Sequence, residues 1–296
     1  MAGRLSFVVL FVMVACAALA QGEGALPAGI EDRCVALLRD ALANETEWVR
    51  VHAAEALLSH GLGEGVEAVY APLVDSAPPH RIGVWRVLAR AQADDARQRY
   101  IARVRDAFLD IDGPDRLHAA ETLAKLGYAE RLVELLRVAR EESGAFQAYA
   151  RWALANSGTA ADEAALAELL TSDDARTRGC AAYGLRFLPV LREATLAALD
   201  AALDAEPVDS PARIHQLCAH YAHGQGERRA KVEEALVRLA REGDKGERYQ
   251  ACAALGLGGD AGIIGVLVER LEDAETNVRI SAADALLALH ERLACF

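Results

Sequence analysis

Along most of this chain an arginine recurs at steps of only 31 or 35 residues, once Gln147 is counted as a member of the series. A fixed period of about 20–50 residues is the signature of one supersecondary unit copied along a chain. The series therefore predicts a repeat architecture and constrains the fold more than any other feature. Its members are Arg50, Arg81, Arg116, Gln147, Arg178, Arg213, Arg248 and Arg279.

The composition favours helices over strands. Apolar residues make up 53% of the chain but aromatic residues only 5%, because alanine and leucine dominate. Both are strong helix formers, and no alternating β-branched pattern predicts a strand. The net charge of −12 argues against a nucleic-acid partner, since phosphate binding needs a clustered positive face.

Cap residues bracket one helix in each repeat. Good N-cap types stand four residues before most members of the series, where a side-chain oxygen can accept an unpaired backbone N–H. Proline follows three of the cap positions by two residues, and glycine follows several arginines by eleven. The pattern predicts a helix of 14 residues around each arginine. The caps are Thr46, Asp112, Ser143, Asp174, Asp209 and Asp244; the prolines are Pro79, Pro114 and Pro211; the stops are Gly61, Gly127, Gly158, Gly224 and Gly259.

Alanine and leucine form an apolar stripe on each bracketed helix, three and seven residues after the arginine. A second amphipathic segment precedes each of these helices, and the short connections predict antiparallel hairpins that bury their apolar faces against the next hairpin. We therefore expect one α-solenoid of eight hairpins over residues 28–296. The preceding helices are expected at 31–43, 64–75, 95–110, 129–142, 162–171, 191–205, 227–242 and 261–272.

The string Asp-x-x-x-Arg-x-x-Ala-Ala-x-x-Leu, at 112–123 and 174–185, resembles HEAT-like repeats, and the 31-residue step resembles the phycobilisome-lyase type. The resemblance implies an armadillo-like superhelix in which the arginines pair with acidic cap residues in a structural ladder. The competing interpretation is a row of guanidinium groups that binds anions. The ladder acids would be Asp112, Asp174, Asp209 and Asp244, opposite Arg50, Arg81, Arg116, Arg178, Arg213, Arg248 and Arg279.

Residues 1–20 resemble a secretory signal peptide, with an apolar run over 5–15 and a small-x-small cleavage site at 18–20. Cleavage there leaves 21–27 as a short linker before the solenoid. A competing pattern, ending at Cys16, resembles a bacterial lipoprotein box and would place a lipid anchor on that cysteine. Both patterns predict an exported protein, periplasmic or secreted, with no transmembrane span in the mature chain.

Positions two and five residues after the arginine are expected on the concave surface. Repeats four and five carry aromatic residues there, and Tyr, Trp and Arg are enriched at binding hot spots. The pattern predicts a contact surface for another protein or peptide. The competing interpretation places Trp152 or Phe187 in the core between repeats. The predicted contact residues are Tyr149, Trp152, Tyr183, Arg186 and Phe187.

Histidines in the sixth repeat raise a metal-site alternative. His220 and His223 are three residues apart, and His215 lies on the same expected helix, but no carboxylate supports them at helical spacing. The interpretation that we favour is an irregular repeat whose polar groups satisfy one another. Deoxyhypusine hydroxylases, HEAT-like enzymes that use His-Glu pairs, are not matched, because the one such dipeptide here is His290-Glu291.

These observations predict a protein-binding scaffold or adaptor of the cell envelope, without enzymatic activity, cofactor or metal. The alternative is a metal- or pigment-dependent enzyme of the HEAT-like lyase or hydroxylase type, using the sixth repeat and Cys218. A third interpretation is a spacer that self-associates through its apolar C-terminal end, which includes Leu287, Leu289 and Phe296.

Overall fold

The computed structural model describes residues 26–128 and 130–294, and every regular element in that part of the chain is a helix. The predicted all-α solenoid is thereby confirmed as the fold class. The predicted signal peptide, the Cys16 anchor, most of the 21–27 linker and Phe296 lie outside the described residues. Within the described ranges, no helix combines the length and apolar character needed to cross a bilayer.

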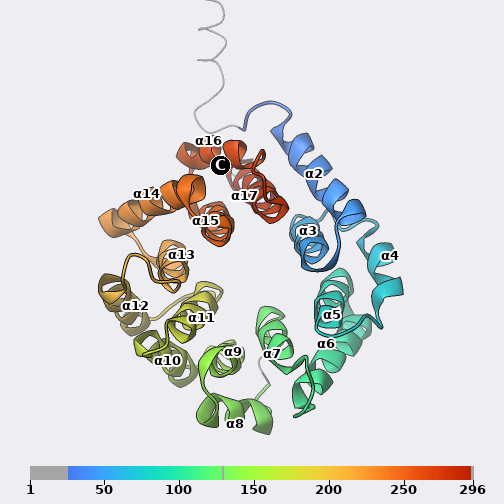
Figure 1. Ribbon diagram of the computed structural model, residues 1–296, viewed down its shortest axis with the longest axis vertical. Helices are drawn as coiled ribbons and strands as arrows, with labels where there is room; N and C mark the ends of the chain where they lie inside the picture. The colour runs from blue at the N-terminus through green and yellow to red at the C-terminus, as the bar shows by residue number, and fades with distance from the viewer. Residues whose placement is uncertain (1–25, 129, 295–296) are drawn as a thin grey trace, which may run out of the picture.

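Each hairpin contributes one helix to an outer layer and one to an inner layer (Figure 1). The outer helices are α2 (Ile30–Asn44), α4 (Val66–Tyr70), α6 (Asp94–Leu109), α8 (Val133–Glu141), α10 (Ala160–Glu168), α12 (Glu193–Ala205), α14 (Gly226–Glu242) and α16 (Ile264–Arg270). The inner helices are α3 (Glu47–Ser59), α5 (His80–Ala91), α7 (Arg116–Lys125), α9 (Gly144–Ala155), α11 (Ala175–Arg186), α13 (Arg213–His223), α15 (Lys245–Gly258) and α17 (Thr276–Ala294). Short 3-10 segments extend three outer helices, at Ala71–Leu73, Leu169–Thr171 and Ala261–Ile263.

Several of the predicted helix brackets are present. The Asp174 carboxylate accepts from the Thr177 backbone N–H at 2.9 Å, and Asp244 forms a capping box with Glu247 at the start of α15. At the other end, Gly61, Gly127 and Gly158 have φ of 69°, 72° and 74°, which glycine adopts without a steric penalty. These residues set the ends of the inner helices locally.

The predicted helix starts were wrong in the three repeats with a proline in this position. Helices α5, α7 and α13 begin directly after or two residues after their prolines, so Asp112 and Asp209 precede the helix and cap nothing. The reason is that proline pushes the preceding residue into extended conformation. Gly224 and Gly259 also differ from the prediction, because their φ values of −74° and −73° are not left-handed.

The core consists of the predicted alanine and leucine columns. Both columns are buried in every repeat that carries them, from Ala53 and Leu57 in α3 to Ala282 and Leu286 in α17. Small residues next to these columns let neighbouring inner helices approach closely. In α15, a Cβ added to Gly256 would lie 2.6 Å from the Cβ of Ala285 in α17. Burial of this stripe is therefore shared between successive repeats.

The row of repeats closes into a ring, which the sequence analysis did not predict (Figure 1). Helix α17 packs against α15 of the seventh repeat on one side. On the other side it packs against α2 and α3 of the first repeat. Leu287 and Leu289, considered above as a self-association surface, are buried within this arrangement. Leu287 and Leu289 are thus covered by helices of the same chain.

Polar contacts line the closing seam between the first and last repeats. His60 uses both ring nitrogens, with Nε2 2.9 Å from Asp284 Oδ1 and Nδ1 2.8 Å from Glu291 Oε1. His52 Nδ1 lies 2.9 Å from Asn277 Oδ1 across the same seam. Further pairs join Arg33 to Glu272 and His290 to Glu31. Because His60 meets two carboxylates, its charge state affects the seam directly.

We expect His60 to stabilise the fold in its protonated form. Burial lowers the His60 pKa, but hydrogen bonds to Asp284 and Glu291 outweigh that effect and raise the pKa from 6.5 to about 9. Since the folded-state pKa is the higher one, this stabilisation is complete below pH 6.5 and disappears as the pH rises through 9. This pKa shift corresponds to about 3 kcal/mol of folding stability. Because the two carboxylates are partly exposed to solvent, we expect about 1 kcal/mol of it to be measurable.

The measurement is urea unfolding of the wild type and of His60→Gln, at a pH below 6.5 and at a pH above 9. The variant should be less stable at the lower pH and close to the wild type at the higher one. An equal difference at both pH values would show that the seam does not depend on His60 protonation.

Candidate functional site

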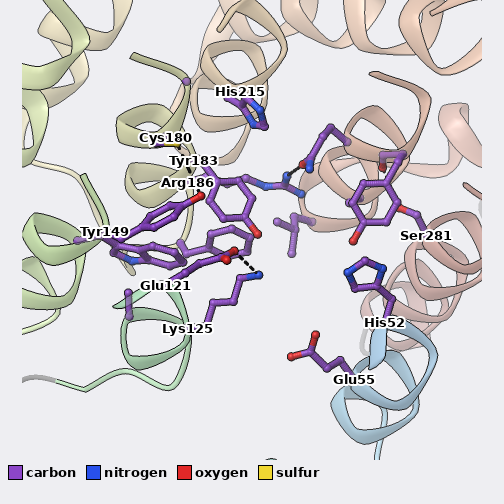
Figure 2. A pocket seen from close by; sticks show the side chains of 18 of the residues that line it. His52, Glu55, Glu121, Lys125, Tyr149, Cys180, Tyr183, Arg186, His215 and Ser281 are labelled. Atoms are coloured by element: carbon purple, nitrogen blue, oxygen red, sulfur yellow. Dashed lines mark hydrogen bonds and ion pairs between the residues drawn. The ribbon is translucent and has the colours of Figure 1, made fainter. Parts of the chain in front are cut away.

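The inner helices enclose a central cavity of about 1040 Å³. This cavity is lined by most residues of the two columns that were expected on the concave surface. The concave face of the solenoid therefore points toward the ring axis. From the first column these are His52, Tyr149, Cys180, His215, Gln250 and Ser281, and from the second Glu55, Glu121, Trp152, Tyr183, Ala253 and Asp284. Figure 2 shows that side chains from α3, α7, α9, α11, α13, α15 and α17 converge on one space.

One wall of the cavity carries paired charges. Arg86 donates to both carboxylate oxygens of Glu55, at 2.8 and 3.0 Å, and to Thr122 Oγ1 at 3.1 Å. Burial alone would raise the Glu55 pKa, but Arg86, Arg90 and Lys125 together lower it to about 2. Glu55 is therefore ionised at neutral pH and fully occupied by its own arginines.

A second pair stands beside the first. Lys125 Nζ lies 2.7 Å from Glu121 Oε1, one helical turn away on α7. Burial would lower the Lys125 pKa, yet the Glu121 carboxylate holds it above its ordinary value. A lysine in this state is a poor nucleophile, because the nucleophilic form is the neutral amine. The pair presents a fixed ion pair to the cavity rather than a reactive amine.

The predicted aromatic surface lies beside the second pair, with Lys125 Nζ 5.5 Å from the Tyr183 ring centroid. Trp152 stacks on Phe187 with ring centroids 5.6 Å apart, and Tyr183 lies edge-on to Phe187 at 5.0 Å. Trp152 is only 1% exposed, whereas Phe187 is 44% exposed. The competing interpretation therefore holds for Trp152, which packs into the inter-repeat core against Gly184, where an added Cβ would meet the indole at 3.0 Å.

The remaining predicted contact residues also lie at the cavity. Tyr149 accepts a weak hydrogen bond from the Cys180 thiol at 3.7 Å. Arg186 is buried at the end of α11 and donates from Nη1 to Gln250 Oε1 at 3.1 Å. All five residues of the predicted surface thus come together, on the inside of a ring.

The sixth-repeat histidines do not converge. His220 Nε2 lies 2.9 Å from Asp200 of α12, and His223 Nε2 contacts the Leu185 carbonyl oxygen at 3.0 Å. Of these three histidines, only His215 lines the cavity. Cys218 is buried, and burial raises its thiol pKa to about 11. The described residues contain no group of three His, Cys, Asp or Glu side chains arranged to hold a metal.

The arginine series makes ion pairs, but with acids other than the predicted caps. Arg178 pairs with Glu206 at 2.8 Å and Arg248 with Asp273 at 2.9 Å, each in the next repeat. Arg81 pairs with Asp115. The predicted partners are engaged elsewhere or misplaced, since Asp174 and Asp244 cap their own helices while Asp112 and Asp209 precede theirs.

Other arginines of the series bind backbone oxygens instead. Arg213 donates to the carbonyl groups of Leu203 and Glu206, and Arg279 donates to that of Asp273. Arg116 contacts both the Phe108 carbonyl and Glu134. These contacts satisfy carbonyls at the ends of outer helices. Arg50 Nε is buried and has no partner within residues 26–128 and 130–294.

Sequence reasoning missed the role of the charged pairs. Glu55, Arg86 and Glu121 occupy consecutive members of one column, with alternating sign. Residues in equivalent positions of adjacent repeats lie side by side, so the alternation itself was the signal for an ion-pair row.

Comparisons with known proteins give the fold alone. No family model matches the sequence, and no curated protein matches it either. Similar solved structures include human deoxyhypusine hydroxylase in complex with glycerol, at 20% identity and a TM-score of 0.42, covering 89% of this chain and 97% of that one. Two engineered proteins are similar at 20% and 18% identity with TM-scores of 0.30 and 0.22, covering 88% of this chain each and 78% and 97% of their own.

The prediction that the chain is not an enzyme is corrected by this comparison. One of the similar structures is itself an enzyme, so the helical-repeat fold does not exclude catalysis. At 20% identity the likeness assigns no reaction to this chain.

We expect the Arg86–Glu55 pair to be strongly coupled. Arg86→Met leaves the Glu55 carboxylate buried without its bidentate partner and should lower the free energy of unfolding by about 3 kcal/mol. The double variant Arg86→Met/Glu55→Leu should recover most of that loss. Arg90→Met, whose Nε is 3.6 Å from Glu55 on a more exposed side chain, is the control and should cost less than about 1 kcal/mol. Equal effects of the two single variants in chemical denaturation would refute the assignment.

Proposed function

We propose that this ring binds a small ligand, or the end of a peptide chain, inside its central cavity. The observation that carries the proposal is the cavity of about 1040 Å³, lined by aromatic side chains and by oriented charges. Ligand sites typically occupy about 300–1,000 Å³ and combine apolar walls with a few convergent polar groups. The size and chemistry of this cavity both agree with that class.

The size of the cavity also limits which part of a protein partner could bind inside the ring. A stable protein–protein interface buries about 800 Å² on each partner, which requires an open face. Here the concave face is turned inward, so a partner of the scaffold type would insert only an extended segment or a chain end. The proposal therefore replaces a broad docking surface with an enclosed site.

We extend the proposal to the compartment on sequence grounds alone. The secretory pattern of residues 1–20 supports an exported binding protein of the cell envelope. Mass determination of the mature N-terminus would separate cleavage after Ala20 from lipid attachment at Cys16.

Blocking the cavity should abolish ligand binding. Ala253 lines the cavity from α15, and Ala253→Trp places an indole in that space. We expect the wild type to bind one molecule of the aromatic probe 1-anilinonaphthalene-8-sulfonate, and Ala253→Trp to weaken that binding at least about tenfold. Fluorescence titration of the folded proteins gives both dissociation constants.

The matched control is Ala201→Trp, at an exposed position of outer helix α12. This variant carries the same substitution within a helix but leaves the cavity open, so it should bind the probe as the wild type does. Equal probe binding by all three proteins would place the probe outside the ring and refute the proposed site.

A further inference from the structure

Arg186 is the most unusual charge in the cavity. Its side chain is 5% exposed and points into the cavity from the C-terminal end of α11 (Figure 2). Among the residues that the structure describes, the guanidinium makes one hydrogen bond to a side chain, from Nη1 to the neutral Gln250 Oε1 at 3.1 Å, and its Nε has no partner. A buried guanidinium has five N–H donors to satisfy, so most of its capacity is unused.

No carboxylate of the described residues lies within ion-pairing distance of Arg186. This sets it apart from the other buried charges that face the cavity. Glu55 is held by Arg86, Glu121 by Lys125, and Asp284 by His60. A buried charge without a partner is costly. The carbonyl end of α11 offsets part of that cost, which explains how the ring holds this cation without an acid.

The balance of charge around the cavity points the same way. Four arginine or lysine side chains line it, against three carboxylates that already have cationic partners. Arg176, the other lining cation without an acid, is exposed to water at the edge of the cavity. The net charge of the whole chain is −12, so the charge of the cavity lining is opposite in sign to that of the protein as a whole.

The immediate surroundings of Arg186 define the rest of the site. The Phe187 ring centroid lies 5.2 Å from the guanidinium carbon, and Tyr183 lies next to Phe187. His215 is edge-on to Tyr183 at 5.7 Å, and its Nδ1 has no partner. Burial and the Arg186 charge lower the His215 pKa to about 4, so the ring is neutral at physiological pH. One cation thus stands among aromatic rings and a neutral hydrogen-bonding group.

We infer that Arg186 anchors the anionic group of an aromatic or apolar ligand, with a carboxylate as the fitting partner and Gln250 and His215 beside it. This inference rests on the proposed function and names the ligand class. A carboxylate matches the planar guanidinium with two parallel N–H donors, and the rings of Tyr183 and Phe187 accept the body of the ligand.

The test uses three matched probes that share one ring system: 2-naphthoate, 2-naphthyl phosphate and the neutral 2-naphthamide. Calorimetric titration of the full chain gives the dissociation constant of each. The wild type should bind 2-naphthoate more tightly than the amide. Arg186→Gln should weaken binding of the carboxylate by about 10- to 100-fold, as expected for a lost hydrogen bond to a charged group, and change the amide less than about threefold.

Two controls keep the outcomes distinct. Arg176→Gln removes a cation from the exposed edge and should change 2-naphthoate binding by less than about threefold. Thermal unfolding checks that Arg186→Gln is folded; because it removes an unpaired buried charge, its midpoint should not fall below that of the wild type.

Equal binding of all three probes by the wild type and Arg186→Gln would overturn the anion inference while leaving the cavity as a ligand site. Loss of the phosphate but not the carboxylate in Arg186→Gln would replace the carboxylate by a phosphate ester as the ligand class. Binding that persists in Ala253→Trp, or no binding of any probe to the wild type, would overturn the proposed function and the inference with it.

Discussion

The contact between alanine and leucine stripes on neighbouring inner helices determines the rest of this structure. Each repeat buries its stripe against the next, and small residues beside the stripes allow the close approach seen between Gly256 and Ala285. A row of such contacts needs a partner at each end. Here the last stripe meets the first repeat, because α17 packs on α2 and α3, and the row becomes a ring.

The sequence was sufficient to predict the repeats but not the ring. Contacts within a repeat, such as the Asp244 capping box and the buried Leu255, depend on residues close in the chain and can be inferred from spacing. Closure depends on the small rotation between repeats, accumulated over eight copies. Seam contacts such as that of His60 with Asp284 join residues more than two hundred positions apart, and no periodic pattern encodes them.

The candidate site was predictable to a similar extent. The repeat register identified residues that face inward, including Tyr149 and Tyr183. It did not show that Trp152 would be covered by its neighbours, or that Arg186 would be left without an acid while Arg86 gained one. Those differences depend on which side chains meet across the repeats, so they become visible only with the three-dimensional arrangement.

Closure of the ring changes how the molecule resists local unfolding. In an open array the two outermost units have a single neighbour each and fray first. In this chain α2 and α17 support one another, so no described unit occupies such a position. Local unfolding of any hairpin must then disrupt packing on both of its sides. The shape of the cavity is therefore maintained by the packing of all eight repeats, not only by the residues that line it.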